Sequence, residues 1–150
     1  MINSKDYLIK NLFELNVFCT HLVKEFSEKT IILLDGPMGV GKTKTIDTIV
    51  RSLAEENASS GHAASPTFGL HNHYQFKELS IDHFDLYRIE SEDDLESTGF
   101  WDVFLKPRGW IFIEWPDRLD VRNLPVGWKI LKLSMKLESE TRVFSLSEIQ

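Results

Sequence analysis

The sequence predicts a three-layer α/β fold with a mixed central sheet and an antiparallel hairpin near its C-terminal end. Two short apolar segments, residues 30–35 and 110–113, have the continuous hydrophobicity of strands that are buried on both faces. Residues 4–26 and 42–55 instead carry apolar side chains at helical spacing. Because helices alternate with buried strands along the chain, we expect helices to be layered on one sheet.

The length and composition suit a single domain that spans residues 1–150. The chain has 150 residues, 42% of them hydrophobic, and a chain of this size buries about 68–70% of its unfolded surface. Its apolar runs are far shorter than the stretch of about 20 residues that a membrane span needs. Residues 1–6 lack the pattern of a secretory signal. Cys19 is the single cysteine, so no intrachain disulfide can form, and we expect a cytoplasmic protein.

The charge of the chain is negative and unevenly distributed. The net charge is −6, and residues 82–96 hold seven acidic side chains against one basic side chain, Arg88. We interpret this acidic segment as a solvated helix face. Such a chain lacks the basic surface that binds nucleic-acid phosphates. If RNA is involved, we expect a partner protein to supply most of the phosphate contacts.

The first half of the chain predicts a helix, a strand and a second helix, in that order. The strand at 30–35 runs into a glycine-rich turn at 36–41, and the helix at 42–55 follows directly. A loop is expected at 57–61. The apolar stripe of the first helix, at 4–26, comprises Leu8, Leu12, Leu15, Cys19, Leu22 and Phe26.

The second half predicts mainly strands. Segments 70–76 and 79–86 have the pattern of two paired strands. Ser91 and Asp94 form a capping box, which predicts the start of a short helix that ends near Gly99.

The last part of the chain predicts a buried strand and a hairpin. The turn at 106–109 precedes the strand at 110–113. Apolar and polar residues alternate over 131–137, and a polar turn separates this segment from a further strand at 142–146. This pattern is typical of an antiparallel hairpin.

Residues 36–43 match the phosphate-binding pattern G-x-x-x-x-G-K-[ST] in full. Its glycines allow backbone N–H groups to point inward at phosphate oxygens, and the N-terminus of the next helix favours negative charge. Lys42 can reach the β- and γ-phosphates, and the hydroxyl of Thr43 can bind Mg²⁺. The pattern predicts a nucleoside-triphosphate site in a P-loop NTPase-like fold. The expected nucleotide-binding residues here are Gly36, Met38, Gly39, Val40, Gly41, Lys42, Thr43 and Lys44.

Two acidic residues and one hydroxyl are candidates for the metal and the attacking water. Asp85 and Glu114 each follow a predicted strand; one would hold Mg²⁺ and the other would orient or deprotonate the water. The residues alone leave these two roles open. Thr67 follows a polar loop and Pro66, where a hydroxyl can sense the γ-phosphate or complete the Mg²⁺ shell. A turn hydroxyl that bonds its own backbone is an equal alternative for Thr67.

Together these segments resemble the TsaE family, the P-loop ATPases of bacterial tRNA threonylcarbamoyladenosine biosynthesis. The resemblance covers residues 34 to 125 in family order and spacing. It is carried by Leu-Asp-Gly-Pro-Met-Gly-Val-Gly-Lys-Thr at 34–43, Ser-Pro-Thr-Phe-Gly-Leu at 65–70 with Tyr74, His-Phe-Asp-Leu-Tyr-Arg at 83–88, Asp94-Leu95 with Gly99, and Ile-Glu-Trp-Pro-Asp at 113–117 with Leu124-Pro125.

The resemblance implies specific roles. Asp85 would be the Mg²⁺ residue, Thr67 would belong to a switch-like loop, and Glu114 would position the attacking water beside Lys42. Trp115 would lie near the nucleotide. The cofactors implied are ATP and Mg²⁺. ATP turnover would drive cycles of a TsaB–TsaD complex, through which the protein would act on tRNA indirectly.

The sequence departs from the family pattern at two positions. Pro37 stands where the family usually has an acid, and Lys44 replaces the usual second hydroxyl. Neither change alters the expectation of nucleotide binding, since the backbone forms the cradle.

Other functions remain open at this point. Arg118 and Arg122 resemble the lid arginines of small-molecule kinases, although a solvated helix or loop face is the favoured interpretation of both. A nucleotide-gated binding module is a third alternative, whereas a GTPase is disfavoured because no Asn-Lys-x-Asp motif occurs.

Paired histidines suggest one further alternative. A zinc site built from the pairs His71 with His73 and His83 with Asp85 is a weaker hypothesis than packed or surface imidazoles.

Overall fold

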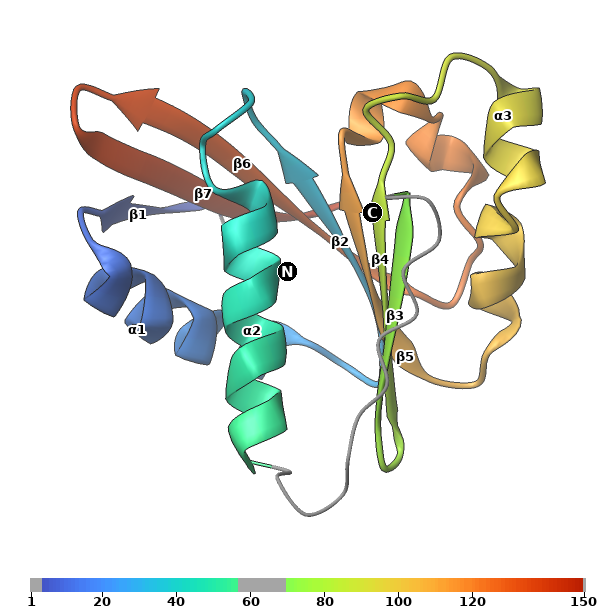
Figure 1. The fold of residues 1–150 in the computed structure, drawn as a ribbon, viewed down its shortest axis with the longest axis horizontal. Helices are drawn as coiled ribbons and strands as arrows, with labels where there is room; N and C mark the ends of the chain where they lie inside the picture. Colours follow the sequence, from blue (N-terminus) through green and yellow to red (C-terminus); the bar gives the residue numbers. More distant parts are fainter. Residues whose placement is uncertain (1–3, 57–69, 150) are drawn as a thin grey trace.

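A computed structural model describes residues 4–56 and 70–149 and contains a seven-stranded mixed sheet. The strand order is β1-β7-β6-β2-β5-β4-β3 (Figure 1). The four central strands, β6, β2, β5 and β4, are parallel to one another. The outer pairs, β1 with β7, β7 with β6 and β4 with β3, are antiparallel. The strands are β1 (Lys5–Ile9), β2 (Lys29–Asp35), β3 (His71–Phe76), β4 (Leu79–Asp85), β5 (Gly109–Glu114), β6 (Lys129–Glu138) and β7 (Thr141–Ile149).

Helical elements cover both faces of this sheet and give the fold three layers (Figure 1). Helices α1 (Leu12–Leu22) and α2 (Lys42–Glu56) pack on one face, and α3 (Glu92–Ser97) with the 3₁₀ helix η2 (Phe100–Leu105) packs on the other. Successive residues of β2 point to opposite faces, so Ile32 joins the first core and Ile31 joins the second. The α/β fold class predicted from the sequence is confirmed.

Most predicted elements are present at nearly the predicted bounds. Strands β2 and β5 and helix α2 form around the glycine-rich turn, and β3 pairs with β4 in antiparallel register. The side chain of Ser91 accepts a hydrogen bond from the backbone N–H of Asp94 at 3.1 Å, as the capping box predicts. The C-terminal hairpin forms from β6 and β7, and β6 also pairs with β2 in parallel.

The predicted helix over residues 4–26 is wrong at its N-terminal end. Residues Lys5–Ile9 form β1, which completes the edge of the sheet beside β7, so its inward-facing side chains reach the core. The helix begins only after Asn11, whose side chain accepts a hydrogen bond from the backbone of Glu14 at 2.9 Å. Leu8 and Leu12, which belonged to the predicted apolar stripe, are 60% and 62% exposed. The loop expected at 57–61 lies outside the described residues.

Three short 3₁₀ helices complete the described part of the fold. They are η1 (Val23–Glu25), which extends α1, and η3 (Pro116–Arg118) and η4 (Val121–Asn123), which follow β5. Within residues 4–56 and 70–149, every helix is too short or too polar to cross a membrane.

Candidate functional site

The glycine-rich turn connects the end of β2 to the start of α2, at the edge where the parallel strands end. Gly39 and Gly41 have φ angles of +81° and +112°, a backbone region that other residues rarely adopt. Gly36 is packed under β6, because a Cβ atom there would lie 2.6 Å from the backbone oxygen of Met135. The turn therefore needs glycine at these positions to hold its shape and to approach β6.

A cavity of about 280 Å³ opens in front of this turn. It brings together the turn, the start of α2 and the ends of β4 and β5, as expected where parallel strands end at one edge of a sheet. The cavity is lined by Met38, Gly39, Gly41, Lys42, Thr43, Lys44, Asp85, Tyr87, Glu114 and Trp115.

Most of the residues predicted as a site therefore line one cavity, and two of those that the structure describes do not. Gly36 lies behind the turn, and Val40 is buried in the core with 1% exposure. Thr67 lies outside the described residues. Tyr87 also lines the cavity; it was not predicted as a site residue, although it belongs to the segment 83–88 that carries the family resemblance.

Lys42 is buried at the base of the cavity. Its Nζ atom donates to the backbone oxygens of Gly36 at 2.5 Å and Pro37 at 3.2 Å. The same atom lies 3.8 Å from the ring centre of Trp115. Burial lowers the pKa of Lys42, and the nearby carboxylates, first among them Glu114, partly oppose this effect.

Glu114 is the buried acid of the site, with 2% exposure. Its carboxylate accepts hydrogen bonds from Thr43 Oγ1, at 3.1 Å to Oε1 and 2.9 Å to Oε2. The Nε2 atom of His83 lies 2.5 Å from Oε2 of the same carboxylate. The contact with His83 was not predicted, because it depends on how β4 and β5 are aligned.

Asp85 lies beside Glu114 in the sheet, since the two residues are register partners of parallel strands. Its carboxylate is half-buried and accepts a hydrogen bond from the backbone N–H of Tyr87 at 3.0 Å. Both acids selected from the sequence thus face the same cavity as Thr43. Carboxylate and hydroxyl oxygens are the ligands that Mg²⁺ prefers.

Aromatic side chains form one wall of the cavity. Trp115 has a left-handed backbone, with φ +59°, which is uncommon for a bulky residue and is concentrated at functional sites. Its ring lies 5.0 Å from that of Tyr87, and the guanidinium of Arg118 lies 5.9 Å from the Tyr87 ring. Arg118 contacts this wall from outside the cavity.

The second arginine of the kinase alternative is engaged elsewhere. Arg122 donates to both carboxylate oxygens of Asp120, with its Nη2 atom at 2.8 Å from Oδ2. These hydrogen bonds hold the pKa of Asp120 at about 2. The two arginines do not converge on the cavity, since neither is among its lining residues.

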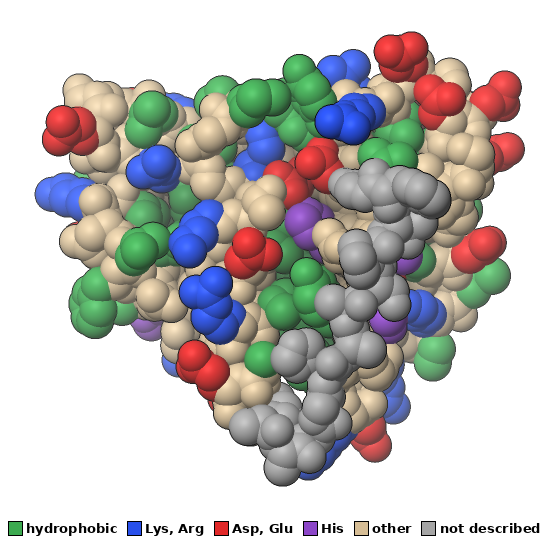
Figure 2. Space-filling model, in the orientation of Figure 1, with side chains coloured by type: hydrophobic (Ala, Val, Ile, Leu, Met, Phe, Trp, Pro, Cys, Tyr) green, Lys and Arg blue, Asp and Glu red, His purple; other side chains and the backbone are tan. Residues whose placement is uncertain are grey.

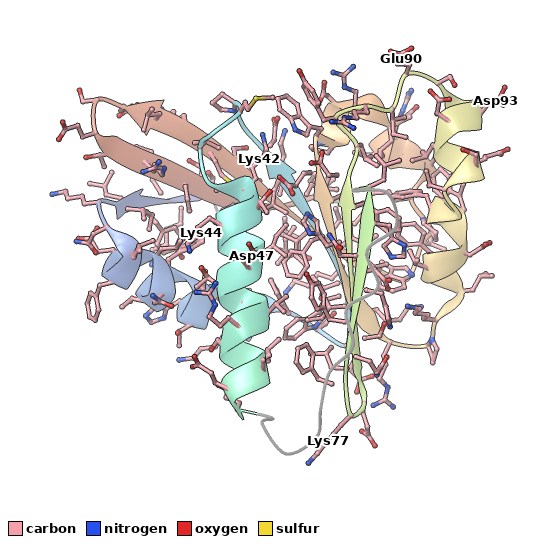
Figure 3. The ribbon with its side chains drawn as sticks, in the orientation of Figure 1. Lys42, Lys44, Asp47, Lys77, Glu90 and Asp93 are labelled. Atoms are coloured by element: carbon pink, nitrogen blue, oxygen red, sulfur yellow. The ribbon has the colours of Figure 1, made fainter. Side chains whose placement is uncertain are left out.

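A second cavity, of about 310 Å³, lies on the other side of the glycine-rich turn, next to α1 and β7. It shares Gly39, Gly41 and Lys44 with the first cavity. Figure 3 labels Lys42 and Lys44 at the N-terminal end of α2. The other residues of this mainly apolar cavity are Ile9, Asn11, Leu12, Leu15, Val40, Arg142 and Phe144.

The paired histidines do not form one metal site. His71 and His73 both contact Oδ1 of Asp82, at 2.8 and 2.9 Å. Asp82 precedes His83 in β4, so these groups lie on the opposite face of the sheet from His83 and Asp85. Among residues 4–56 and 70–149, no group of three or more His, Cys, Asp and Glu side chains is arranged to hold a metal.

The acidic segment 82–96 divides into two parts. Asp82 and Asp85 belong to β4, and Asp85 lines the cavity, whereas the acids at 90–96 are not among its lining residues. Glu90 and Asp93 are exposed around α3, at the edge of the molecule (Figure 3), and Figure 2 shows acidic side chains spread around this corner. The interpretation of a solvated helix face therefore holds for the exposed acids around α3 and is wrong for Asp82 and Asp85, which lie on a strand.

Residues 9–144 match the protein family described as threonylcarbamoyl adenosine biosynthesis protein TsaE. The chain belongs to the TsaE family. The resemblance stated from the sequence motifs is therefore confirmed.

Curated TsaE proteins are similar over much of the chain. The protein from Synechocystis is 31% identical over 119 residues, which cover 78% of this chain and 73% of that protein. The protein from Borreliella burgdorferi is 31% identical and covers 78% of this chain and 80% of its own length. The protein from Haemophilus influenzae is 34% identical, and the match spans 61% of its length. Each is described as a tRNA threonylcarbamoyladenosine biosynthesis protein.

A solved structure has the same fold. The crystal structure of YdiB from Bacillus subtilis superimposes with a TM-score of 0.70 at 18% sequence identity, covering all of this chain and 88% of the other. At this identity the likeness supports the TsaE chain's fold.

Proposed function

We propose that this TsaE protein is a Mg²⁺-dependent ATPase that supports threonylcarbamoyladenosine modification of tRNA by cycling a TsaB–TsaD complex. The observation that carries the proposal is the single cavity in which Lys42, Thr43, Asp85 and Glu114 meet. Family membership supports the pathway, and the cavity supports the chemistry.

The cavity suits the phosphates of ATP. The N–H groups of the turn at Gly39 and Gly41 lie at the N-terminus of α2, a helix of 15 residues whose dipole favours anions. Lys42 would exchange the carbonyl oxygens of Gly36 and Pro37 for phosphate oxygens. Lys44 adds a second positive charge at the rim. The face of the Trp115 ring would hold the Lys42 side chain in place through its contact with the ammonium group.

The donor set also suits Mg²⁺. Thr43 and Asp85 would hold the ion together with phosphate oxygens and water, as is usual for Mg²⁺ in nucleotide sites. The ion would supply neutralisation of the charge on the phosphates. Thr67 is proposed to complete this group from the segment beyond the described residues.

Glu114 is proposed to position the attacking water. Once Thr43 turns its hydroxyl away, the carboxylate can accept a hydrogen bond from a water in line with the γ-phosphate. The water oxygen then bonds to phosphorus and passes one proton to a phosphoryl oxygen, while the bond to the bridging oxygen breaks, which releases ADP and phosphate. Positioning and charge neutralisation carry most of the catalysis in such reactions.

The second cavity is the proposed place of the nucleoside. It shares the turn with the phosphate cavity and has an apolar floor, so a nucleotide can lie across the turn with its base on that floor. Arg142 is fixed at this rim, because its Nε atom donates to the backbone oxygen of Val40 at 2.8 Å.

We propose that the TsaB–TsaD partner, and not this chain, makes the contacts with tRNA. The net charge of −6 disfavours direct binding to nucleic acid. We also propose that the protein is one domain that acts in the cytoplasm, where a chain with one buried cysteine needs no disulfide.

Phosphate release from Mg²⁺-ATP tests the proposal, measured with the protein alone and with its TsaB–TsaD pair. Weak release that rises with the pair and disappears without Mg²⁺ is expected. Tight ATP binding with no response to the pair would contradict the proposed partner. Phosphoryl transfer to a small molecule would contradict the proposed reaction.

A further inference from the structure

His83 is a buried residue with a specific partner in the candidate site. Its side chain is 6% exposed and that of Glu114 is 3% exposed, and the two are joined at 2.5 Å. A buried hydrogen bond to a carboxylate is among the stronger polar contacts in proteins. Neither the metal nor the phosphate roles proposed above use His83.

The sheet register explains this contact. Asp85 and Glu114 are register partners in β4 and β5, and His83 precedes Asp85 by two residues. Side chains two residues apart in a strand share a face, so His83, Asp85 and Glu114 all face α2. His83 therefore reaches Glu114 from the sheet, while Thr43 reaches it from the helix.

Nucleotide binding would affect the two contacts of Glu114, with Thr43 and with His83, in different ways. Under the proposed function, Thr43 turns toward the metal and releases the carboxylate. His83 then provides the remaining hydrogen bond to this carboxylate from the part of the chain that the structure describes. Without it, rotation of the Glu114 side chain would spread the carboxylate over several orientations.

We propose that His83 is a positioning residue, whose Nε2–H group donates to Oε2 of Glu114 and aims the carboxylate at the attacking water. This inference rests on the proposed function of Glu114. The residue acts through Glu114 and has no contact with the phosphates of its own.

The chain offers a matched control in a contact that shares strand β4 but joins it to β3 in place of β5. His73 also contacts a buried carboxylate, that of Asp82, but on the opposite face of the sheet. Replacing His73 by leucine removes a comparable hydrogen bond without touching Glu114. Asp82 keeps its contacts with His71 and Lys106 in that variant.

Three variants test the inference: His83→Leu, His83→Gln and His73→Leu. The amide of glutamine can place a donor near the position of Nε2, whereas leucine cannot. Three quantities are measured for each variant: the Kd for Mg²⁺-ATP under conditions of slow turnover, kcat, and the melting temperature. For His83→Leu, we expect kcat to fall about tenfold or more while Kd changes little, because small misplacements of catalytic groups are costly. His83→Gln should recover most of the rate, and His73→Leu should retain it.

A second readout needs no nucleotide. The measurement is a ¹⁵N–¹H NMR correlation spectrum of the histidine side chains. Compared with the wild type, Glu114→Ala should shift the Nε2–H signal of His83 and leave the signals of His73 unchanged. An unchanged His83 signal would overturn the inference.

The kinetic results also separate the inference from the proposed function. If wild-type protein hydrolyses ATP and His83→Leu has the wild-type kcat, the positioning role is wrong and the ATPase proposal stands. His83→Leu could instead bind ATP more weakly, turn over more slowly and melt at a lower temperature. If His83→Gln recovers none of these properties, the positioning role is wrong and His83 has a structural role. If the wild type does not hydrolyse ATP, both the ATPase proposal and the positioning role of His83 are wrong.

Discussion

The hydroxyl of Thr43 donates to both carboxylate oxygens of Glu114, at 3.1 and 2.9 Å, although 71 residues separate them in the chain. The contact joins the first turn of α2 to the end of β5. It places the proposed metal ligand and the proposed water-positioning group within one hydrogen bond of each other. Under the proposed function, nucleotide binding would break this contact, since Thr43 would turn toward the metal.

Replacing Lys42 by alanine should weaken binding of Mg²⁺-ATP by at least about tenfold, since hydrogen bonds to charged groups contribute about 1.5–3 kcal/mol. Isothermal titration calorimetry measures the effect. Lys77→Ala is the control, because Lys77 lies at the far end of the β3–β4 hairpin (Figure 3). Equal affinities of the two variants would remove Lys42 from the phosphate site.

Replacing Asp85 by asparagine should raise the Mg²⁺ concentration for half-maximal hydrolysis by about tenfold or more, because the amide lacks the charge that holds the ion. A magnesium titration of phosphate release checks this expectation. The exposed α3 residue Asp93, changed in the same way, should leave the titration unaltered. A wild-type titration for Asp85→Asn would argue against a metal role.

The stability of the fold should depend on pH through Asp82. Burial raises its pKa, but hydrogen bonds from His71, Lys106 and His73 outweigh burial and hold the pKa at about 2, below the ordinary 3.8. A depressed folded-state pKa gives stability that is present above about pH 4 and is lost as the pH falls toward 2. The difference corresponds to about 2 kcal/mol.

Denaturant unfolding of the wild type and of Asp82→Asn between pH 6 and pH 2 measures this contribution. The variant should be less stable at pH 6, and the two free energies of unfolding should converge at low pH. A constant difference across this range would contradict the assignment.

Replacing Gly36 by alanine should destabilise the protein by about 1–3 kcal/mol, because the new methyl group meets the backbone oxygen of Met135. Thermal unfolding measures the change. Gly39→Ala provides the contrast: its Cβ has no atom within 4 Å, so only its positive φ opposes the substitution, at about 1–2 kcal/mol. A larger loss for Gly39→Ala would mean that the turn moves away from β6.

The sequence was informative where local pattern decides structure. The glycine-rich turn, β2 and α2 are adjacent in the chain, so the motif and its context could be recognised together. Glu114 could also be selected, because a carboxylate that ends an apolar strand stands out, whereas the metal role of Asp85 came from the family resemblance. Their shared cavity follows from the parallel alignment of β4 with β5.

Sequence reasoning failed where the neighbours are distant in the chain. Leu8 and Leu12 fit a helical stripe, but pairing with β7 drew residues 5–9 into the sheet. The contact of His83 with Glu114 required the register of two strands, which no spacing within either strand reveals. The role of Thr67 stays a prediction.

Under the proposed function, Glu114 acts in hydrolysis and is not needed for nucleotide binding. Single-turnover phosphate release by Glu114→Ala, measured beside its ATP affinity and with Glu90→Ala as control, tests this claim most directly. We expect near wild-type affinity with phosphate release slowed at least about 100-fold, because the group that positions the attacking water is lost. Phosphate release at the wild-type rate would contradict it.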